Sequence, residues 1–477
     1  MPEPLPPAAC FIGGEHLIAD GPLRDIINPY TEQPMGSLPE AGAQLVDRAV
    51  HSAAGAHAVW RETPVSDRAQ LLELVADQLE HQGGQLAALV TRQMGMPITL
   101  ARVTQAQLPA RVLRATAALA RADFPWQEEA DGAILHRYGA GVVGAITPWN
   151  MPVHQIIAKV SAAVAAGCSV VLKASEQTPY DALRIAEIFH EAGAPDGLIN
   201  VVTGTGPATG AALAGHPALS RLSFTGSVRA GKAVAGLAAA SLTKCSLELG
   251  GKSPALVLSD ADLTVAIPSA LTSGLVNSGQ ACNATTRMLV PADRMDDVVD
   301  LLQDAAAKFS LGDPMDETTT HGPLVTEVQK TAVLAHIRRA VDQGGRLITG
   351  SVTGPESRER GYFVDPTVLV DLPENADAVR DEIFGPVVVV QPYRDVDDAV
   401  RIANDSDYGL SAEVWSGSVD HAHAVAARLS VGQVKINGVR TRNRPMVPFG
   451  GVRNSGYGRE LGTLGIEEFV DVRAVMA

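Results

Sequence analysis

Between residues 140 and 250 the chain alternates regularly between short apolar runs and longer segments of helical character. The runs are typical of buried strands: GVVGAIT, CSVVLKA, LINVVTG, SRLSFTG and TKCSLEL. The segments between them predict helices at 152–166, 180–192, 208–213 and 230–239. Strands that alternate with single helices predict βαβ units and a parallel sheet covered on both faces. Such sheets bind ligands at the carboxyl ends of their strands.

The flanking segments predict a second body and a small antiparallel element. Residues 43–120 have helical periodicity and are expected to pack on one face of the sheet, whereas 123–139 predicts a β-hairpin. After residue 251 a new series of strands begins: SPALVLS, VVVVQPY, AEVWSG and GQVKING. FVDVRAVMA predicts a terminal strand, which we expect to pair in another subunit because it would otherwise expose an edge. The fold class is therefore α/β, with two Rossmann-like α/β domains and a small hairpin element.

Length and charge exclude several classes of protein. A chain of 477 residues exceeds one ordinary core, so two or more domains are expected. The net charge of −15 argues against a nucleic-acid partner, because phosphate binding needs a basic surface. We expect no membrane partner, since no apolar run reaches the roughly 18 to 20 residues of a membrane span. The first residues, MPEPLPPAAC, lack the features of a signal peptide, and we expect a cytoplasmic protein.

The four cysteines match neither a disulfide framework nor a metal site, so we predict no metal. Cys168 and Cys245 lie in strand-like segments and are expected to fill the core. Cys282 differs, because it follows a glycine-containing turn in SGQAC and precedes a possible helix, ACNATT. Backbone amides and a helix dipole would lower its pKa and favour a thiolate nucleophile. A structural cysteine is an equally good interpretation of this segment alone.

Two polar residues fall at the predicted carboxyl ends of parallel strands. Glu248 ends the strand TKCSLEL, and Asn150 follows the strand GVVGAIT in PWN. Alone, Glu248 is better explained as a solvated strand end and Asn150 as a helix N-cap. Together with Cys282 across a cleft between domains, they supply a nucleophile, a base for water and an oxyanion donor.

Six motifs occur in one order along the chain: PWN, FTGS, LELGGKSP, SGQAC, EIFGP and PFGGVRNSGYGRE. In this order they resemble the aldehyde dehydrogenase superfamily, from about residue 20 to the C-terminus. The resemblance implies an NAD-binding domain (1–122 and 140–250), a catalytic domain (251–452) and oligomerisation or bridging segments (123–139 and 453–477). It also implies a homodimer or homotetramer.

The resemblance implies a covalent mechanism for oxidation of a small-molecule aldehyde to the carboxylic acid. Cys282 would attack the aldehyde, Asn150 would hold the oxyanion, and Glu248 would activate water to hydrolyse a thioester. A proton path from Glu248 through Lys159 and Glu460 is also implied. Acylating relatives, which transfer the thioester to coenzyme A, generally lack this glutamate, so Glu248 favours hydrolysis. A CoA-acylating semialdehyde dehydrogenase and a catalytically silent homologue are the alternatives.

The resemblance also assigns the cofactor residues. A carboxylate at Glu176, beside Lys173, would accept from a ribose 2′-hydroxyl and repel a 2′-phosphate, which favours NAD over NADP. A surface Lys–Glu pair is the alternative. The expected cofactor-binding residues are Ile146, Thr147, Pro148, Trp149, Lys173, Glu176, Gly206, Gly210, Phe224, Thr225, Gly226, Ser227, Leu249, Glu382 and Phe384.

For the aldehyde itself the sequence gives less. The family's substrate tunnel is expected to be lined by Met151, His154, Gln155 and Ala158. These side chains are less aromatic than those that hold quaternary amines, which disfavours betaine aldehyde. Arg440, Arg442 and Arg444 could attract an anionic semialdehyde, although a solvated or subunit-contacting loop explains them better.

Overall fold

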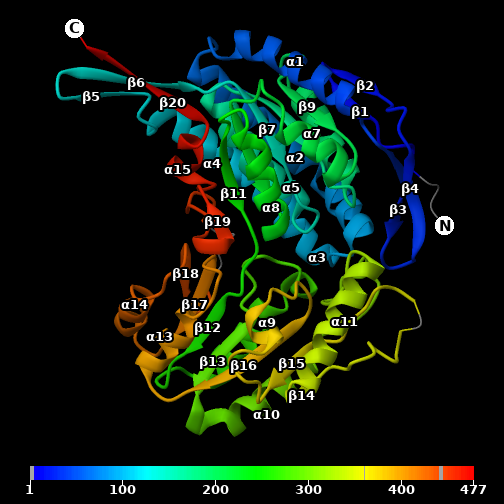
Figure 1. The fold of residues 1–477 in the computed structure, drawn as a ribbon, viewed down its shortest axis with the longest axis vertical. Coiled ribbons are helices and arrows are strands. Elements are labelled where there is room, and N and C mark those ends of the chain that lie inside the picture. The colour runs from blue at the N-terminus through cyan, green and yellow to red at the C-terminus, as the bar shows by residue number, and fades with distance from the viewer. Residues whose placement is uncertain (1–4, 359, 440–443, 477) are drawn as a thin grey trace.

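The computed structural model describes residues 5–358, 360–439 and 444–476, and its largest sheet has eight strands (Figure 1). Five central strands are parallel, with antiparallel strands added at both edges. In spatial order the strands are β19 (Gly456–Tyr457), β11 (Lys244–Glu248), β10 (Arg221–Thr225), β7 (Val142–Ile146), β8 (Ser169–Lys173), β9 (Ile199–Val202), β1 (Cys10–Ile12) and β2 (Glu15–Leu17).

Helices join the consecutive parallel strands, as the alternation of the sequence predicts. They are α5 (Pro152–Ala166), α6 (Pro179–Glu191), a π-helical turn (Gly206–Gly210) running into α7 (Ala211–Ala214), and α8 (Val228–Ala239). The N-terminal helices are α1 (Ala43–Trp60), α2 (Val65–Met94), α3 (Ile98–Ala101), a π-helical segment (Arg102–Gln107) and α4 (Leu108–Ala122). Helix α1 contacts β8 and β9, whereas α2 and α4 pack against α5, so α5 is buried between the sheet and a second helical layer.

The second body is built around a seven-stranded sheet, parallel except for β14 at one edge. In spatial order its strands are β14 (Arg346–Thr349), β15 (Thr367–Val370), β16 (Val387–Tyr393), β13 (Arg287–Pro291), β12 (Pro254–Val257), β17 (Ser411–Trp415) and β18 (Gln433–Ile436). Its helices are α9 (Leu263–Gly274), α10 (Met295–Ala306), α11 (Glu327–Asp342), α12 (Asp377–Arg380), α13 (Val396–Asn404) and α14 (Val419–Ala426). The predicted α/β class with two largely parallel sheets is confirmed.

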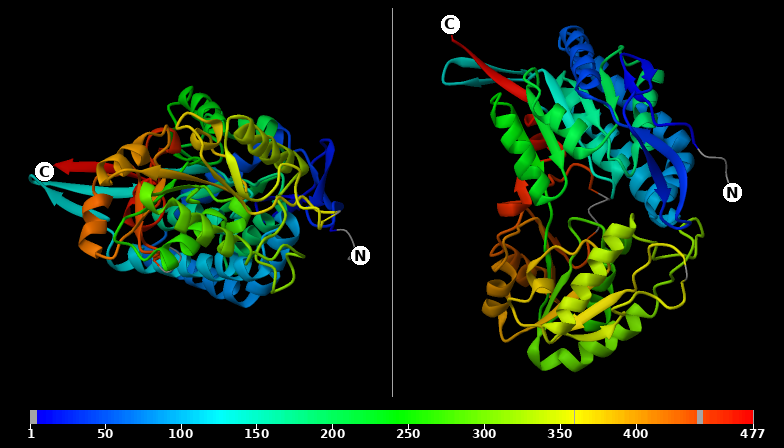
Figure 2. Two further views of the ribbon diagram at one scale, coloured as in Figure 1. Left: turned by 90° about the horizontal axis from the view of Figure 1, so that it is seen from below. Right: turned by 45° about the vertical axis from the view of Figure 1, so that its right-hand side comes forward.

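The C-terminal strand has a partner in its own chain, although the sequence analysis expected it to have none. After α15 (Gly462–Glu467), β20 (Val470–Met476) pairs along its whole length with β6 (Ala133–Gly139), which pairs in turn with β5 (Gln127–Ala130). The premise that this strand has no partner in its own chain was wrong, because the predicted hairpin pairs with one of its edges; β20 remains an edge strand, and its pairing with another subunit stays a prediction. This three-stranded sheet projects from the molecule with the C-terminus at its tip (Figures 1 and 2). A further antiparallel pair is formed by β3 (Leu23–Asn28) and β4 (Gln33–Pro39).

Within residues 5–358, 360–439 and 444–476, no helix has the length and apolar character of a membrane span. The same residues contain no group of three or more His, Cys, Asp or Glu side chains that could hold a metal ion.

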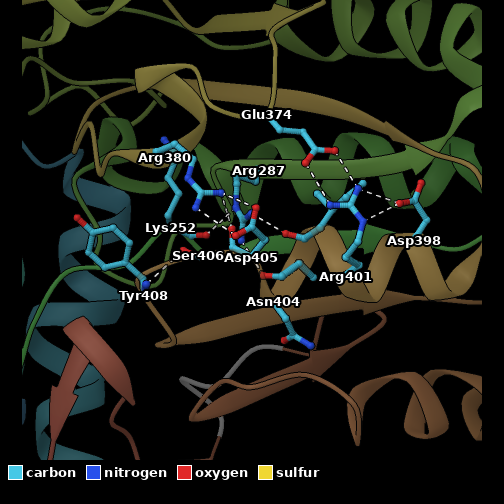
Figure 3. Close-up of polar contacts among 12 residues, drawn as sticks. Lys252, Arg287, Glu374, Arg380, Asp398, Arg401, Asn404, Asp405, Ser406 and Tyr408 are labelled. Carbon is cyan, nitrogen blue, oxygen red and sulfur yellow. Dashed lines mark hydrogen bonds and ion pairs between the residues drawn. The ribbon is translucent and has the colours of Figure 1, made fainter.

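A buried arginine of the second sheet ties the segment that leads into this sheet to the C-terminal end of α13 (Figure 3). Arg287 on β13 is 2% exposed and donates to the carbonyls of Lys252 at 3.0 Å, Ile402 at 3.0 Å and Ala403 at 2.9 Å. The last two carbonyls belong to the C-terminal turn of α13, where a cation is favoured by the helix dipole. Because Lys252 follows the LELGG segment, Arg287 fixes the backbone that leads from β11 into the second body. Ion pairs surround it: Arg380–Asp405, Arg401–Glu374 and Arg401–Asp398.

Replacing Arg287 should therefore destabilise the protein strongly. The change Arg287→Met leaves three buried carbonyls without their donor, and we expect a loss of about 3 kcal/mol or more in the free energy of unfolding. Arg294→Met is the matched control, because Arg294 pairs with Asp297 on the exposed surface and should change stability by about 0.5 kcal/mol or less. Thermal unfolding of both variants checks this, and equal midpoints would contradict the role given to Arg287.

Candidate active site

The turn that carries Cys282 has a backbone conformation that few sequences adopt. Asn277, Ser278 and Gly279 have φ angles of 52°, 56° and 73°, three consecutive residues in the left-handed region. A Cβ atom at position 279 would collide with the backbone carbonyl of Gly385, so only glycine fits there. Left-handed conformations at Asn277 and Ser278 cost roughly 1 to 3 kcal/mol each, and the structure around them must compensate. The SGQAC motif therefore specifies a strained, closely packed turn.

The prediction of a helix-activated thiolate at Cys282 is wrong. Residues 282–283 form a turn and 284–286 have no regular secondary structure, so no helix dipole stabilises the thiolate there. Burial, reinforced by the carboxylates of Glu382, Glu248 and Glu460, raises the pKa of Cys282 to about 12. The side chain is nevertheless partly exposed and lines a cavity. Cys282 is thus a reachable thiol that is protonated at neutral pH.

Asn150 is held against the cysteine turn and is not a helix cap. The N-cap of α5 is Met151, whereas the Asn150 side chain donates from Nδ2 to the carbonyl of Gln280 at 3.0 Å. Asn277 donates from its own Nδ2 to the carbonyl of Asn150 at 3.1 Å. Gln280, fully buried, donates to the Asn277 carbonyl at 3.1 Å and accepts from the Val325 amide at 3.0 Å.

Asn277 and Gln280 are functional positions that the sequence analysis did not single out. They link the end of β7 to the turn before Cys282, and so fix where the Asn150 amide lies. The available signal was their place inside an otherwise apolar and glycine-containing segment, where buried amides need partners.

Glu248 is buried, contrary to its interpretation as a solvated strand end. It ends β11 opposite Thr225 of β10 and is 2% exposed. Neither of its carboxylate oxygens accepts a hydrogen bond from any residue within the described ranges. Burial, followed by repulsion from Glu460, raises the pKa of Glu248 well above its ordinary value. A buried carboxylate without donors is costly for folding, and such groups are often functional.

Lys159 and Glu460 form a buried ion pair beside this carboxylate. Lys159, on α5, is 1% exposed and also donates to the hydroxyl of Thr225 at 2.7 Å. That hydroxyl donates in turn to Gln155 at 3.3 Å. Thr225, predicted to bind the cofactor, therefore has its hydroxyl in this polar network. The charges of Glu460 and Lys159 both act on Glu248, and the proton path through them stays a prediction.

The EIFGP segment brings a second buried carboxylate to the site. Glu382 accepts from the Gly251 amide at 3.1 Å, and burial raises its pKa to about 7. It lies so close to Gly250 that a side chain there would collide with it, which explains the glycine pair of LELGGK. Phe384 has a φ of 55° and meets Trp149 edge to face, with ring centroids 5.4 Å apart.

Most of the residues predicted to hold the cofactor lie at the carboxyl ends of β7, β8, β9 and β10, whereas Leu249 follows β11 and Glu382 and Phe384 precede β16. Lys173 is 2% exposed and pairs with Glu176 at 2.9 Å, and Gly210 lies beside its side chain. Ser227 caps α8 by accepting from the Ala230 amide, so the amides of this helix's first turn face the same edge. Thr147 and Pro148 follow β7, and Gly206 opens the π-helical turn after β9.

Three predicted cofactor contacts have their side chains in the core instead: Ile146, Phe224 and Leu249. Phe224 lies directly under Gly226, where a Cβ atom would meet its ring at 2.6 Å. The side chains of these three residues pack in the core and support the edge of the sheet at which the cofactor is expected to bind. The donor set still fits NAD: helix-end amides suit its phosphates, and the Glu176 carboxylate suits ribose hydroxyls.

A cavity of about 360 Å³ opens at Cys282. Asn150 and Glu460 line it with the predicted tunnel residues Met151, His154 and Gln155, whereas Ala158 is buried inside α5. Burial lowers the pKa of His154, so its imidazole is neutral. Arg444 reaches the cavity, and Arg440 and Arg442 lie outside the described residues. The second sheet supplies the opposite wall: Glu413, Trp415, Gln433, Lys435 and Asn437.

Comparison with known proteins identifies the family. The model of the aldehyde dehydrogenase family matches residues 19–475, and the chain belongs to this family. It is 42% identical over 453 residues to 3-succinoylsemialdehyde-pyridine dehydrogenase of a Pseudomonas species, covering 95% of this chain and 94% of the relative. It is 41% identical to geranial dehydrogenase of Castellaniella defragrans, covering 98% of both chains.

Among solved structures, the fold matches a cysteine-to-alanine mutant of aldehyde dehydrogenase C from Pseudomonas syringae, in complex with NAD+ and octanal. The TM-score is 0.96 at 38% identity, with 98% of this chain and 96% of the other covered.

The raised pKa of Cys282 predicts a steep pH dependence of its alkylation in the free enzyme. Below the pKa the thiolate fraction rises about tenfold per pH unit, so alkylation by iodoacetamide, followed by mass spectrometry of the protein, should still be accelerating from about pH 8 to about pH 10. Cys282→Ser gives the background from the half-buried Cys245. A rate that levels off near neutral pH would show instead that the free enzyme holds a thiolate.

Proposed function

We propose that this protein oxidises a small-molecule aldehyde to the carboxylic acid, with NAD as the oxidant, through a thioester on Cys282. The observation that carries the proposal is Glu248: a buried carboxylate that no described residue hydrogen-bonds, in one cluster with a reachable thiol. Membership of the aldehyde dehydrogenase family supports the same reaction.

The residues have complementary tasks in the first half of the reaction. The Cys282 thiol loses its proton to a base as its sulfur forms a bond to the aldehyde carbon. Glu248 suits this task because its raised pKa makes it a stronger base than an exposed carboxylate. The carbonyl oxygen becomes an oxyanion, for which the Asn150 amide and the Cys282 N–H are the donors. NAD, held by the residues at the strand ends, supplies the acceptor for the hydride that leaves the former aldehyde carbon.

The second half is hydrolysis of the thioester. After the proton taken from the thiol has left Glu248, the carboxylate takes a proton from water, the hydroxide oxygen bonds to the acyl carbon, and the carbon–sulfur bond breaks. Glu248 then gives its proton to the sulfur, which restores the Cys282 thiol. Lys159 and Glu460 provide a route by which the proton leaves the buried site. Glu248 supports hydrolysis over transfer to coenzyme A, and retention of Cys282, Glu248 and Asn150 argues against a silent homologue.

NAD is the cofactor that the site favours over NADP. The Glu176 carboxylate, paired with Lys173, would accept from a ribose hydroxyl and repel a 2′-phosphate. The similar structure of aldehyde dehydrogenase C contains NAD+, which supports this choice.

The proposal extends to the assembly and the division of the chain. We assign residues 1–122 and 140–250 to cofactor binding, 251–452 to catalysis, and 123–139 with 453–477 to bridging and assembly. In a homodimer or homotetramer the outer edge of β20 would pair with another subunit, which would cover Val472, Val475 and Met476, all exposed in the single chain. A cytoplasmic location agrees with four free cysteines.

The purified protein should form NADH with a panel of aldehydes in the absence of coenzyme A, more efficiently with NAD than with NADP. Cys282→Ala should abolish this turnover while the protein still binds NAD. NADH formation only when coenzyme A is present would overturn the hydrolytic role of Glu248, and full activity of Cys282→Ala would overturn the covalent mechanism.

Removing the side-chain amide of Asn150 should slow the chemical step. We expect Asn150→Ala to lower kcat by about 10²- to 10³-fold, because an oxyanion donor acts mainly in the transition state. Asn150, which lines the cavity, can also be changed to Asp. This variant is the sharper comparison, because it keeps the shape of the side chain and removes its N–H donor. Steady-state kinetics that showed only a raised KM for both variants would contradict this role.

A further inference from the structure

The side chain of Gln155 lines the cavity at Cys282 and makes one contact that the proposed mechanism does not use. Its Oε1 atom accepts from the hydroxyl of Thr225 at 3.3 Å, and both residues are buried. Lys159, one turn further along α5, donates to the same hydroxyl oxygen at 2.7 Å. Two residues on one face of α5 therefore hold the hydroxyl of Thr225.

The hydroxyl of Thr225 has a single proton to donate. An ammonium group carries donors only, so Lys159 occupies a lone pair of the hydroxyl oxygen and leaves the proton for another acceptor. In the structure this acceptor is the amide oxygen of Gln155. Lys159 and Gln155 together thus decide the direction in which Thr225 donates.

Glu248 is the competing acceptor for this proton. It lies in register with Thr225 on the neighbouring parallel strand, so both side chains project from the same face of the sheet, with the strands about 4.8 Å apart. A carboxylate is a stronger acceptor than an amide oxygen. Yet neither carboxylate oxygen of Glu248 has a hydrogen-bond partner anywhere in the described chain. The proton of Thr225 is therefore directed away from the stronger of two acceptors.

We propose that Gln155 is a positioning residue, which holds the hydroxyl proton of Thr225 and so keeps the Glu248 carboxylate free of hydrogen bonds. A carboxylate that accepts a hydrogen bond is stabilised in its charged form and becomes a weaker base. Gln155 thereby preserves the basicity with which Glu248 takes protons from the thiol and from water. This inference rests on the proposed function in the role given to Glu248, and adds a residue that tunes this role.

Other charged groups also act on Glu248, and each of them is kept when Gln155 is replaced. They come from α5, from the segment after β19 and from the end of α15: Lys159, Arg459, Glu460 and Glu468. The thiol of Cys282, which also interacts with this carboxylate, is uncharged at neutral pH. A change in the titration of Glu248 on replacing Gln155 is therefore expected to come from the hydroxyl of Thr225.

The test is a pH titration of the Glu248 carboxyl by infrared difference spectroscopy, with Glu248→Gln as the reference that is subtracted. Gln155→Met keeps the length of the side chain and removes its acceptor, so the hydroxyl of Thr225 turns to Glu248. The pKa of Glu248 should fall by about one to two pH units, the worth of a hydrogen bond to a charged group. An unchanged or raised pKa would overturn the inference.

A double variant assigns this effect to the hydroxyl. Thr225→Val removes the hydroxyl and keeps the shape of the side chain, so in this background Gln155→Met should cause no further fall in the pKa of Glu248. A fall of the same size with and without the hydroxyl would contradict the proposal. Ser161→Ala is the matched control on α5: it removes a buried hydroxyl that contacts Thr116 at 3.4 Å, and should leave the titration unchanged.

Thr225→Val alone covers the case in which Gln155→Met does not fold. This variant should not raise the pKa of Glu248, because the hydroxyl makes no bond to the carboxylate in the wild type. A rise would show that the hydroxyl already donates to Glu248, and would overturn the inference.

Kinetics extend the test to the reaction. With an aldehyde and NAD, the acid limb of kcat/KM in Gln155→Met should move to lower pH by the same amount as the infrared titration, and the plateau should fall several-fold. The infrared titration needs no turnover, so the two proposals can fail separately. An absence of NADH with any aldehyde would reject the proposed function, whereas a titration that does not shift would reject only the role of Gln155.

Discussion

One hydrogen bond, from the Asn150 side chain to the Gln280 carbonyl, joins the edge of the first sheet to the turn that carries the thiol. The same amide is the expected oxyanion donor, so the bond positions donor and nucleophile relative to each other. Asn277 and the buried Gln280 hold it from the other side, and Gly279 lets the turn lie against the Gly385 backbone. A strained turn persists because these contacts over-determine it. Catalytic geometry here depends on packing between two bodies, not on a single loop.

The site concentrates buried charge, and most of that charge has a task in the proposed reaction. Glu248 lies at a strand end with no donor among the described residues, near the buried pair of Lys159 and Glu460. Because burial, and after it the neighbouring carboxylates, raise the pKa of both the Cys282 thiol and Glu248, these groups keep their protons more tightly than free side chains do. Proton transfer between such groups is better matched than between an exposed carboxylate and an ordinary thiol.

Local sequence patterns predicted most of the fold, because each strand and helix of a βαβ unit is specified by a short segment of the chain. Helix α5 has the predicted bounds, and the five parallel strands of the first sheet lie within the predicted runs, whereas its edge strands β1, β2 and β19 were not predicted. The errors share a different origin. The pKa of Cys282 depends on carboxylates from distant segments, which local amides and a supposed helix could not reveal. The partner of β20 lies more than three hundred residues earlier in the chain. Glu413 and Lys435 line the cavity but were not named from the sequence, although each is a charged residue inside a predicted strand.

The most direct test of the account is intact-protein mass spectrometry of Glu248→Gln, quenched after mixing with NAD and an aldehyde that the wild type oxidises. If Glu248 activates the water that hydrolyses the thioester, the variant should form about one NADH per site, more slowly than the wild type because Glu248 also takes the thiol proton, and should accumulate an acyl group on Cys282. The protein mass should rise by the mass of the aldehyde minus two hydrogens, because the acyl group replaces the thiol hydrogen, and the adduct should be lost when hydroxylamine is added. Continuous NADH formation at the wild-type rate with no adduct would contradict the assignment of Glu248, and with it the central claim that this buried carboxylate is kept for catalysis.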